Sequence, residues 1–151
     1  MTIQEYIEKD GPFYHISLLS NMDSIIQIGL LPKTCNAICV VRSDEQIVWD
    51  NIIATQFTTG IEQKYCIIKL TPSRHGIKTE NVAEDSIDEP TQPLHNYIAD
   101  IPFIKIDKSD VICDNYVVPK SPGPVPNEMI ERLEGYTRNP IPDTSNIPDY
   151  Y

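Results

Sequence analysis

The sequence predicts an α+β fold with a twisted, mainly antiparallel central sheet and short flanking helices. Helix-like and strand-like segments alternate in the first half of the chain, and further short strands follow a long polar loop. The last strands are joined by links too short for the crossover helices that parallel strands require. This order of elements favours an α+β arrangement over strict βαβ winding.

The expected strands are short apolar or alternating runs bounded by turn residues. They cover residues 13–17, 37–41, 65–70, 94–99, 103–106 and 111–118. In the first strand, the period of two places Phe13, His15 and Ser17 on one face of the sheet. Tyr14 and Ile16 then face the other side.

Helix starts are predicted from capping patterns, in which a Ser or Thr is followed three residues later by an acidic or amide residue. Three such pairs occur: Thr2 with Glu5, Ser20 with Asp23, and Ser43 with Gln46. Gly29 stands where the C-terminal glycine of a helix belongs, and Pro32 follows it. The tryptophan of the third helix, Trp49, is interpreted as a core residue because aromatic side chains dominate core packing.

The sequence predicts one domain, residues 1–119, followed by a proline-rich C-terminal arm or disordered tail, residues 120–151. A length of 151 residues fits a single domain with an ordinary core. The arm has dense Pro and Gly, one short helix-like segment at 127–133 and no periodicity beyond it. Its last residues, Asp149, Tyr150 and Tyr151, are a candidate contact to a partner or to a second copy in a homo-oligomer.

The acidic composition limits which classes of partner the protein can bind. The chain has 12 Lys and Arg and 22 Asp and Glu, which gives a net charge of −10. Counterion release from phosphates therefore cannot supply most of the affinity for a nucleic acid, and an anionic membrane is disfavoured for the same reason. No apolar run is long enough for a membrane span. We expect a cytoplasmic protein.

The cysteines indicate a reducing compartment and no metal. Four of them occur, at positions 35, 39, 66 and 113. Cys39 and Cys66 lie within apolar strand-like runs, which is typical of buried reduced thiols. No second Cys or His pair follows at the spacing of a zinc site.

Three histidines, an arginine and an acidic loop carry the candidate chemistry. His15 on the first strand could present a ring nitrogen to a ligand beside Ser17, or it could be a satisfied structural histidine. Arg42 follows the second strand and could bind an anion, or it could pair at the surface with Asp44 or Glu45. His95 enters a strand after the acidic loop, and His75 lies in a turn where exposure is expected. The acidic run ending at Glu89 is typical of a solvated loop.

Three segments together resemble the opening of the ADP-ribosyltransferase-like superfamily. They are Tyr14-His15-Ile16-Ser17, then Asn21-Met22-Asp23-Ser24-Ile25-Ile26, then Gly29-Leu30-Leu31-Pro32. Residues 37–42, 44–56, 65–70 and 96–106 resemble the elements that follow in that superfamily. The similarity covers about residues 12–107 and is to the branch of DNA-acting ADP-ribosyltransferase toxins and RNA 2′-phosphotransferases.

The resemblance implies a split, twisted sheet that holds NAD as a substrate in a cleft. It implies cofactor-binding roles for Tyr14, His15 and Ser17, and a phosphate-binding role for Arg42. The macromolecular target that it implies is a protein or a nucleic acid of unknown type.

The late-strand glutamate of the superfamily is missing, because the corresponding stretch reads Leu94-His95-Asn96-Tyr97. Cleavage of the nicotinamide–ribose bond needs negative charge near an oxocarbenium-like centre. We therefore expect His95 and a loop carboxylate, Glu89 first, to serve the reacting centre together with His15 and Arg42. The alternatives are a 2′-phosphotransferase-like reaction that uses His15, Arg42 and His95, a catalytically inactive interaction module on the same fold, and an unrelated small α+β protein.

Overall fold

One antiparallel sheet organises the protein. The computed structural model describes residues 2–32, 37–56, 64–84 and 95–117. Its strands are β1 (Phe13–Leu18), β2 (Ala37–Val41), β3 (Tyr65–Leu70), β4 (Val82–Glu84), β5 (His95–Ala99) and β6 (Val111–Tyr116). They form a six-stranded sheet in the order β4-β5-β2-β1-β3-β6, and all of its pairings are antiparallel. The predicted α+β class is confirmed.

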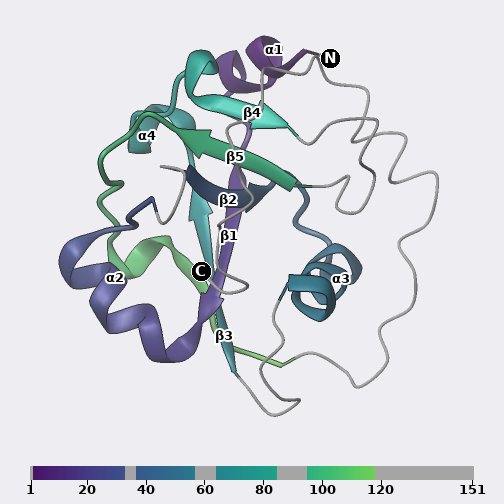
Figure 1. Cartoon of the computed structure of the whole chain (residues 1–151), viewed down its shortest axis with the longest axis vertical. Coiled ribbons are helices and arrows are strands. Elements are labelled where there is room, and N and C mark those ends of the chain that lie inside the picture. Colours follow the sequence, from purple (N-terminus) through teal and green to yellow (C-terminus); the bar gives the residue numbers. More distant parts are fainter. Residues whose placement is uncertain (1, 33–36, 57–63, 85–94, 118–151) are drawn as a thin grey trace.

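The helices are short and lie on both sides of the sheet. They are α1 (Ile3–Glu8), α2 (Met22–Ile28), α3 (Gln46–Gln56) and α4 (Pro72–His75), with 3₁₀ turns at Leu19–Asn21, Thr79–Asn81 and Lys108–Asp110. Thr2 caps α1 as predicted, since its hydroxyl accepts the Glu5 amide at 3.1 Å. Figure 1 shows α2 and α3 on opposite sides of the central strands.

Strand alternation buries apolar side chains on both faces of the sheet, as the sequence predicts for β1. Phe13 packs with Ile38 and Ile68 on the side of α2. On the side of α3 the buried cluster contains Tyr14, Ile16, Tyr65, Ile67, Trp49 and Tyr116. Trp49 is confirmed as a core residue, and its indole nitrogen donates to the Ser43 carbonyl at 2.8 Å.

The sheet diverges between β1 and β2. β1 pairs with β3 along its whole length, and β2 does the same with β5. Within the described strands, β1 and β2 pair in register only at Tyr14 and Val41. In Figure 1, β2, β5 and β4 accordingly run across the view, whereas β1 and β3 run from top to bottom. The two halves of the sheet therefore meet at one end of β1 and separate towards the other.

The structure corrects two predictions of secondary structure and adds a helix. Ser20 does not cap α2, because a 3₁₀ turn occupies Leu19–Asn21 and the helix begins at Met22. Residues 103–106 are not a strand and contribute only a bridge between Ile104 and Leu30. The helix α4 was not predicted, and it begins at Pro72, whose fixed φ suits the first helical position.

His75 is buried rather than exposed. Its side chain is 2% accessible, and its Nε2 lies 3.2 Å from the Asp110 carboxylate, which also binds Arg74 at 2.8 Å. Burial alone would raise the pKa of Asp110, but hydrogen bonds from Arg74, the Asp107 amide and His75 outweigh it and lower that pKa. This network joins α4 to the 3₁₀ turn before β6. The C-terminal arm, with its helix-like segment at 127–133, lies outside the described residues.

Candidate functional site

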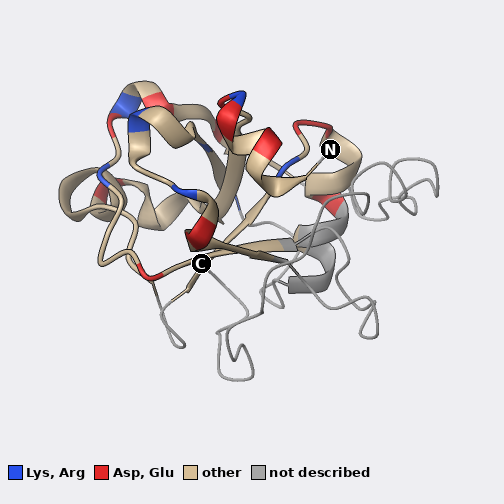
Figure 2. Cartoon of the chain, turned by 90° about the horizontal axis from the view of Figure 1, so that it is seen from above, with Lys and Arg blue, Asp and Glu red and all other residues tan. Residues whose placement is uncertain are grey.

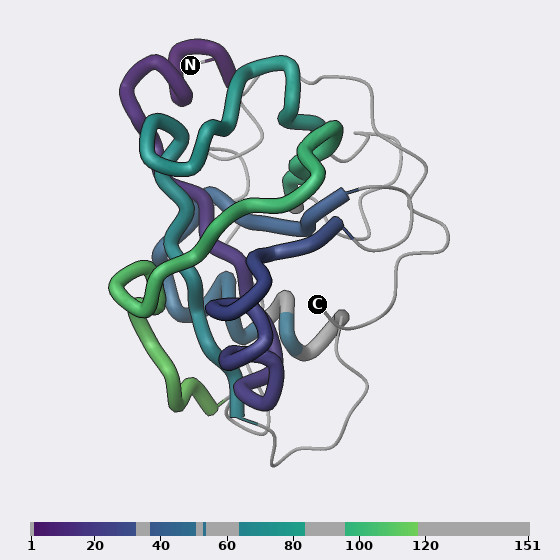
Figure 3. The backbone as a smooth tube through the Cα atoms, turned by 90° about the vertical axis from the view of Figure 1, so that its left-hand side faces the viewer, coloured from purple at the N-terminus to yellow at the C-terminus, as the bar shows by residue number. Residues whose placement is uncertain are grey.

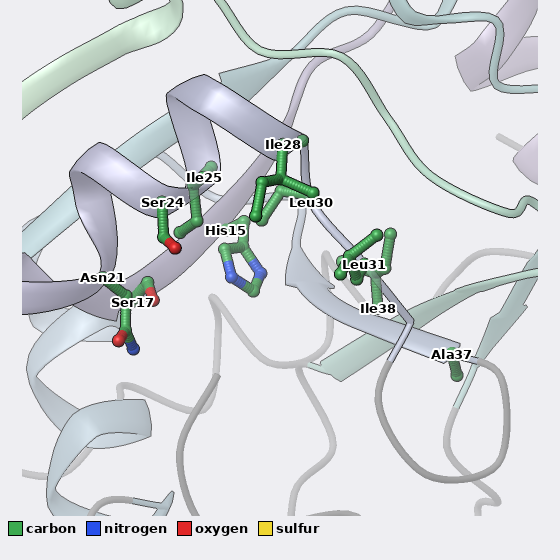
Figure 4. A pocket seen from close by; sticks show the side chains of 11 residues that line it. His15, Ser17, Asn21, Ser24, Ile25, Ile28, Leu30, Leu31, Ala37 and Ile38 are labelled. Carbon is green, nitrogen blue, oxygen red and sulfur yellow. The ribbon is translucent and has the colours of Figure 1, made fainter.

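A pocket lies where the two halves of the sheet separate, under α2. Its volume is about 140 Å³. Figure 4 shows its side chains, which come from β1, the 3₁₀ turn before α2, α2 itself, the segment after α2 and β2. The lining residues are His15, Ser17, Asn21, Ser24, Ile25, Ile28, Gly29, Leu30, Leu31, Ala37 and Ile38.

His15 is held at the floor of this pocket by β2. Its Nδ1 lies 2.8 Å from the carbonyl oxygen of Cys39, and the side chain is 3% exposed. A carbonyl only accepts hydrogen bonds, so Nδ1 carries the proton and donates it. In the neutral ring Nε2 is then an acceptor, and in the protonated ring it becomes a second donor. The hydrogen bond of Nδ1 agrees with the structural interpretation of His15.

The pocket has a polar end and an apolar end. Ser17, Asn21 and Ser24 gather at one end, and the imidazole of His15 lies between them and the apolar end. Ile28, Leu30, Leu31 and Ile38 surround the other end. Such a pocket suits a ligand with an apolar part and a hydrogen-bonding part.

Gly29 shapes the wall at the apolar end. Its φ is +106°, and a Cβ at this position would lie 2.9 Å from the backbone oxygen of Ile104. The adjacent Leu30 exchanges two backbone hydrogen bonds with Ile104, at 2.8 and 2.9 Å. The green segment containing Ile104 accordingly passes beside the end of α2 in Figure 3. The predicted C-terminal glycine of α2 is confirmed.

Two of the predicted cofactor-binding residues do not line the pocket. Tyr14 belongs to the α3 side of the sheet, where its ring centroid lies 5.7 Å from that of Trp49. Alternation along β1 therefore separates Tyr14 from His15 and Ser17. Arg42 is 8% exposed, so it is buried and not at the surface as the ion-pair interpretation expected, and it is not a lining residue of the pocket.

His95 begins β5, and its backbone pairs with Val41 of β2. Its side chain lies outside what the structure describes, so the predicted role of His95 stays a prediction. Glu89 lies outside the described residues.

Asn21 and Ser24 are pocket residues that the sequence interpretation did not select. They lie three residues apart around the start of α2, on the side of the helix that also carries Ile25 and Ile28. That spacing, directly after a strand with His15 and Ser17 on one face, was the available signal. The sequence interpretation instead used the neighbouring pair, Ser20 and Asp23, as a capping pattern.

The described part of the chain contains no group of three or more His, Cys, Asp or Glu side chains placed to hold a metal ion. Cys39 and Cys66 are buried free thiols, as predicted, and burial raises the pKa of Cys66 to about 11. No helix among the described residues has the length and apolar character to cross a membrane.

Comparison with known proteins gives no relative. No protein-family model matches the chain, and no curated protein or solved structure matches it either.

Proposed function

We propose that this chain is an NAD-dependent ADP-ribosyltransferase-like protein whose pocket receives one nucleoside half of NAD. The observation that carries the proposal is the position of His15 and Ser17, which lie on one strand face at the floor of a pocket where the sheet separates. The apolar end would hold the ring, and Ser17, Asn21 and Ser24 would bind the ribose hydroxyls. Pockets for drug-sized ligands have volumes of roughly 300–1,000 Å³. The volume of about 140 Å³ therefore suits part of a dinucleotide.

The proposed reaction transfers ADP-ribose from NAD to a nucleophile of the acceptor. The bond between nicotinamide and the ribose C1 breaks, and nicotinamide leaves with the bonding electron pair. A bond from C1 to the nucleophile forms, and the proton of the nucleophile passes to a base or to water. His15 would position the ribose through Nε2, and Glu89 remains the proposed carboxylate for the positive charge that develops on the ribose.

A direct test measures the NAD-dependent rise in melting temperature and the release of nicotinamide. At one hundred times its Kd, a ligand adds about 2.7 kcal/mol to stability. Ser24 is exposed on α2 and lines the pocket, so Ser24→Leu should narrow the pocket without disturbing the core. It should abolish the NAD effect, whereas Gln27→Leu, an exposed position on α2 outside the lining, should keep it. An NAD effect that survives in Ser24→Leu, or that is missing in the wild type, contradicts the proposal.

The second candidate is a catalytically inactive module that binds a nucleotide on the same scaffold. It is favoured by the absence of Asp and Glu from the lining residues in the described part of the chain. Glu89→Gln separates the two candidates. If the chain is an enzyme, Glu89→Gln should bind NAD but no longer release nicotinamide. If it is an inactive module, neither the wild type nor Glu89→Gln should release nicotinamide. A 2′-phosphotransferase-like reaction has less support, because Arg42 does not line the pocket.

A further inference from the structure

Three large apolar side chains are exposed around the mouth of the pocket. Ile28 is 58% exposed, Leu31 44% and Phe103 52%. Ile28 and Leu31 also line the pocket. Phe103 lies across Gly29, because a Cβ added to this glycine would approach the phenyl ring to 3.1 Å. The three side chains, which we call the rim patch, are thus continuous with the pocket.

The rim patch favours contact with apolar atoms over contact with phosphates. No Lys or Arg lines the described pocket. Near Phe103 in the sequence, one exposed acidic residue, Asp100, and one exposed basic residue, Lys105, offset each other. Figure 2 shows that basic residues lie interspersed with acidic ones over the helices and loops. The net charge of −10 adds long-range attraction for a basic partner and repulsion for a nucleic acid.

We propose that the acceptor, if the proposed function holds, is a protein that places an apolar segment with basic flanks on the rim patch. Burial of Ile28, Leu31 and Phe103 supplies the affinity, because removal of apolar surface from water drives most protein association. The continuity of the patch with the pocket puts the acceptor next to the ribose held at Ser17 and Ser24. The basic flanks complement the acidic chain and speed the encounter.

The test uses three fluorescently labelled probes and one matched control variant. The probes are a helical peptide of Leu and Lys, a peptide of equal charge with Ser in place of Leu, and a DNA duplex. Phe103→Ser changes the rim patch and leaves every lining residue of the pocket unsubstituted. Ile112→Ser removes a side chain of similar exposure, 48%, from β6. Fluorescence anisotropy gives the affinity of each probe for each protein.

We expect the Leu/Lys peptide to bind the wild type and Ile112→Ser equally, and Phe103→Ser about tenfold more weakly. The Ser/Lys peptide and the duplex should bind all three proteins weakly. Four outcomes would each overturn the proposal. They are equal affinity for both peptides, an equal loss of peptide affinity in both variants, tighter binding of the duplex than of the Leu/Lys peptide, and self-association of the wild type that Phe103→Ser abolishes.

The NAD effect on melting temperature separates this proposal from the proposed function. Phe103→Ser should keep the NAD effect, because Phe103 lies outside the pocket. If the peptides behave as expected while NAD has no effect on the wild type, the patch is a protein-binding surface and its role as an acceptor site is overturned. If NAD stabilises the wild type while the peptides show no preference, the proposed function stands and the protein acceptor is overturned.

Discussion

The Nδ1 of His15 donates a hydrogen bond to the carbonyl oxygen of Cys39 across the opening between β1 and β2. The two strands pair by backbone only at Tyr14 and Val41, so this side-chain bond adds a second link between the halves of the sheet. It also orients the ring, because the carbonyl fixes which nitrogen carries the proton. One residue therefore both closes the sheet and forms the floor of the pocket.

Replacement of His15 by Phe tests that link. The phenyl ring fills the space of the imidazole but cannot donate to the Cys39 carbonyl, which is left buried without this donor. We expect a loss of about 1–3 kcal/mol in the free energy of unfolding, measured by urea denaturation. A loss below about 0.5 kcal/mol, the range of neutral surface substitutions, would show that the link contributes nothing.

Gly29→Ala should be much more destabilising than Gly76→Ala. Both glycines have positive φ, +106° and +71°, but only at Gly29 would the new methyl group meet backbone, 2.9 Å from the Ile104 oxygen. We expect the free energy of unfolding to fall by about 3 kcal/mol in Gly29→Ala and by about 1 kcal/mol in Gly76→Ala. Thermal unfolding measures both. Equal losses would mean that the segment around Ile104 moves away from α2 at little cost.

Asp110→Asn should destabilise the protein at pH 7 and lose its effect in acid. Arg74 and His75 hold the folded-state pKa of Asp110 below its ordinary value. A carboxyl whose pKa is lowered by folding stabilises the protein at pH values above its pKa in the unfolded chain, about 3.9. This stabilisation is lost as the pH falls through the pKa of the folded state. We expect Asp110→Asn to lower the free energy of unfolding by about 1–2 kcal/mol at pH 7, and by less below about pH 4.

Asp107→Asn is the control for this prediction, because Asp107 binds the same Arg74 at 2.9 Å but its side chain is 62% exposed. Exposed ion pairs contribute at most about 1 kcal/mol, so this variant should be close to the wild type. Urea denaturation at a series of pH values gives both curves. A loss for Asp110→Asn that persists unchanged in acid would exclude the carboxylate as its cause.

Asn96→Val should stabilise the protein. The Asn96 side chain is 1% exposed on β5, and neither Nδ2 nor Oδ1 has a hydrogen-bond partner within the described part of the chain. A buried amide without partners costs about 1–3 kcal/mol, so an apolar side chain should raise the free energy of unfolding by about 1 kcal/mol. Asn115→Val, at an exposed position on β6, should change it by less than about 0.5 kcal/mol. Destabilisation by Asn96→Val would show that the amide is satisfied in solution.

Local patterns were sufficient for most of the fold and for half of the site. The alternation in residues 13–17 placed His15 and Ser17 on one face, and both line the pocket. The same alternation predicts that Tyr14 faces away, but the resemblance to a family gave it a cofactor-binding role. Asn21 and Ser24 were not predicted, because their spacing of three residues only places them on one side of a helix and does not say what that side contacts.

The sequence alone determined most of the strands and helices and which side chains along β1 share a face, because backbone period and capping act over a few residues. Tertiary structure decided the strand order, the opening between β1 and β2, and the burial of Arg42 and His75. These depend on contacts between residues far apart in the chain, such as His15 with Cys39 and Asp110 with Arg74. No local pattern encodes such contacts, since each depends on the three-dimensional packing of both partners.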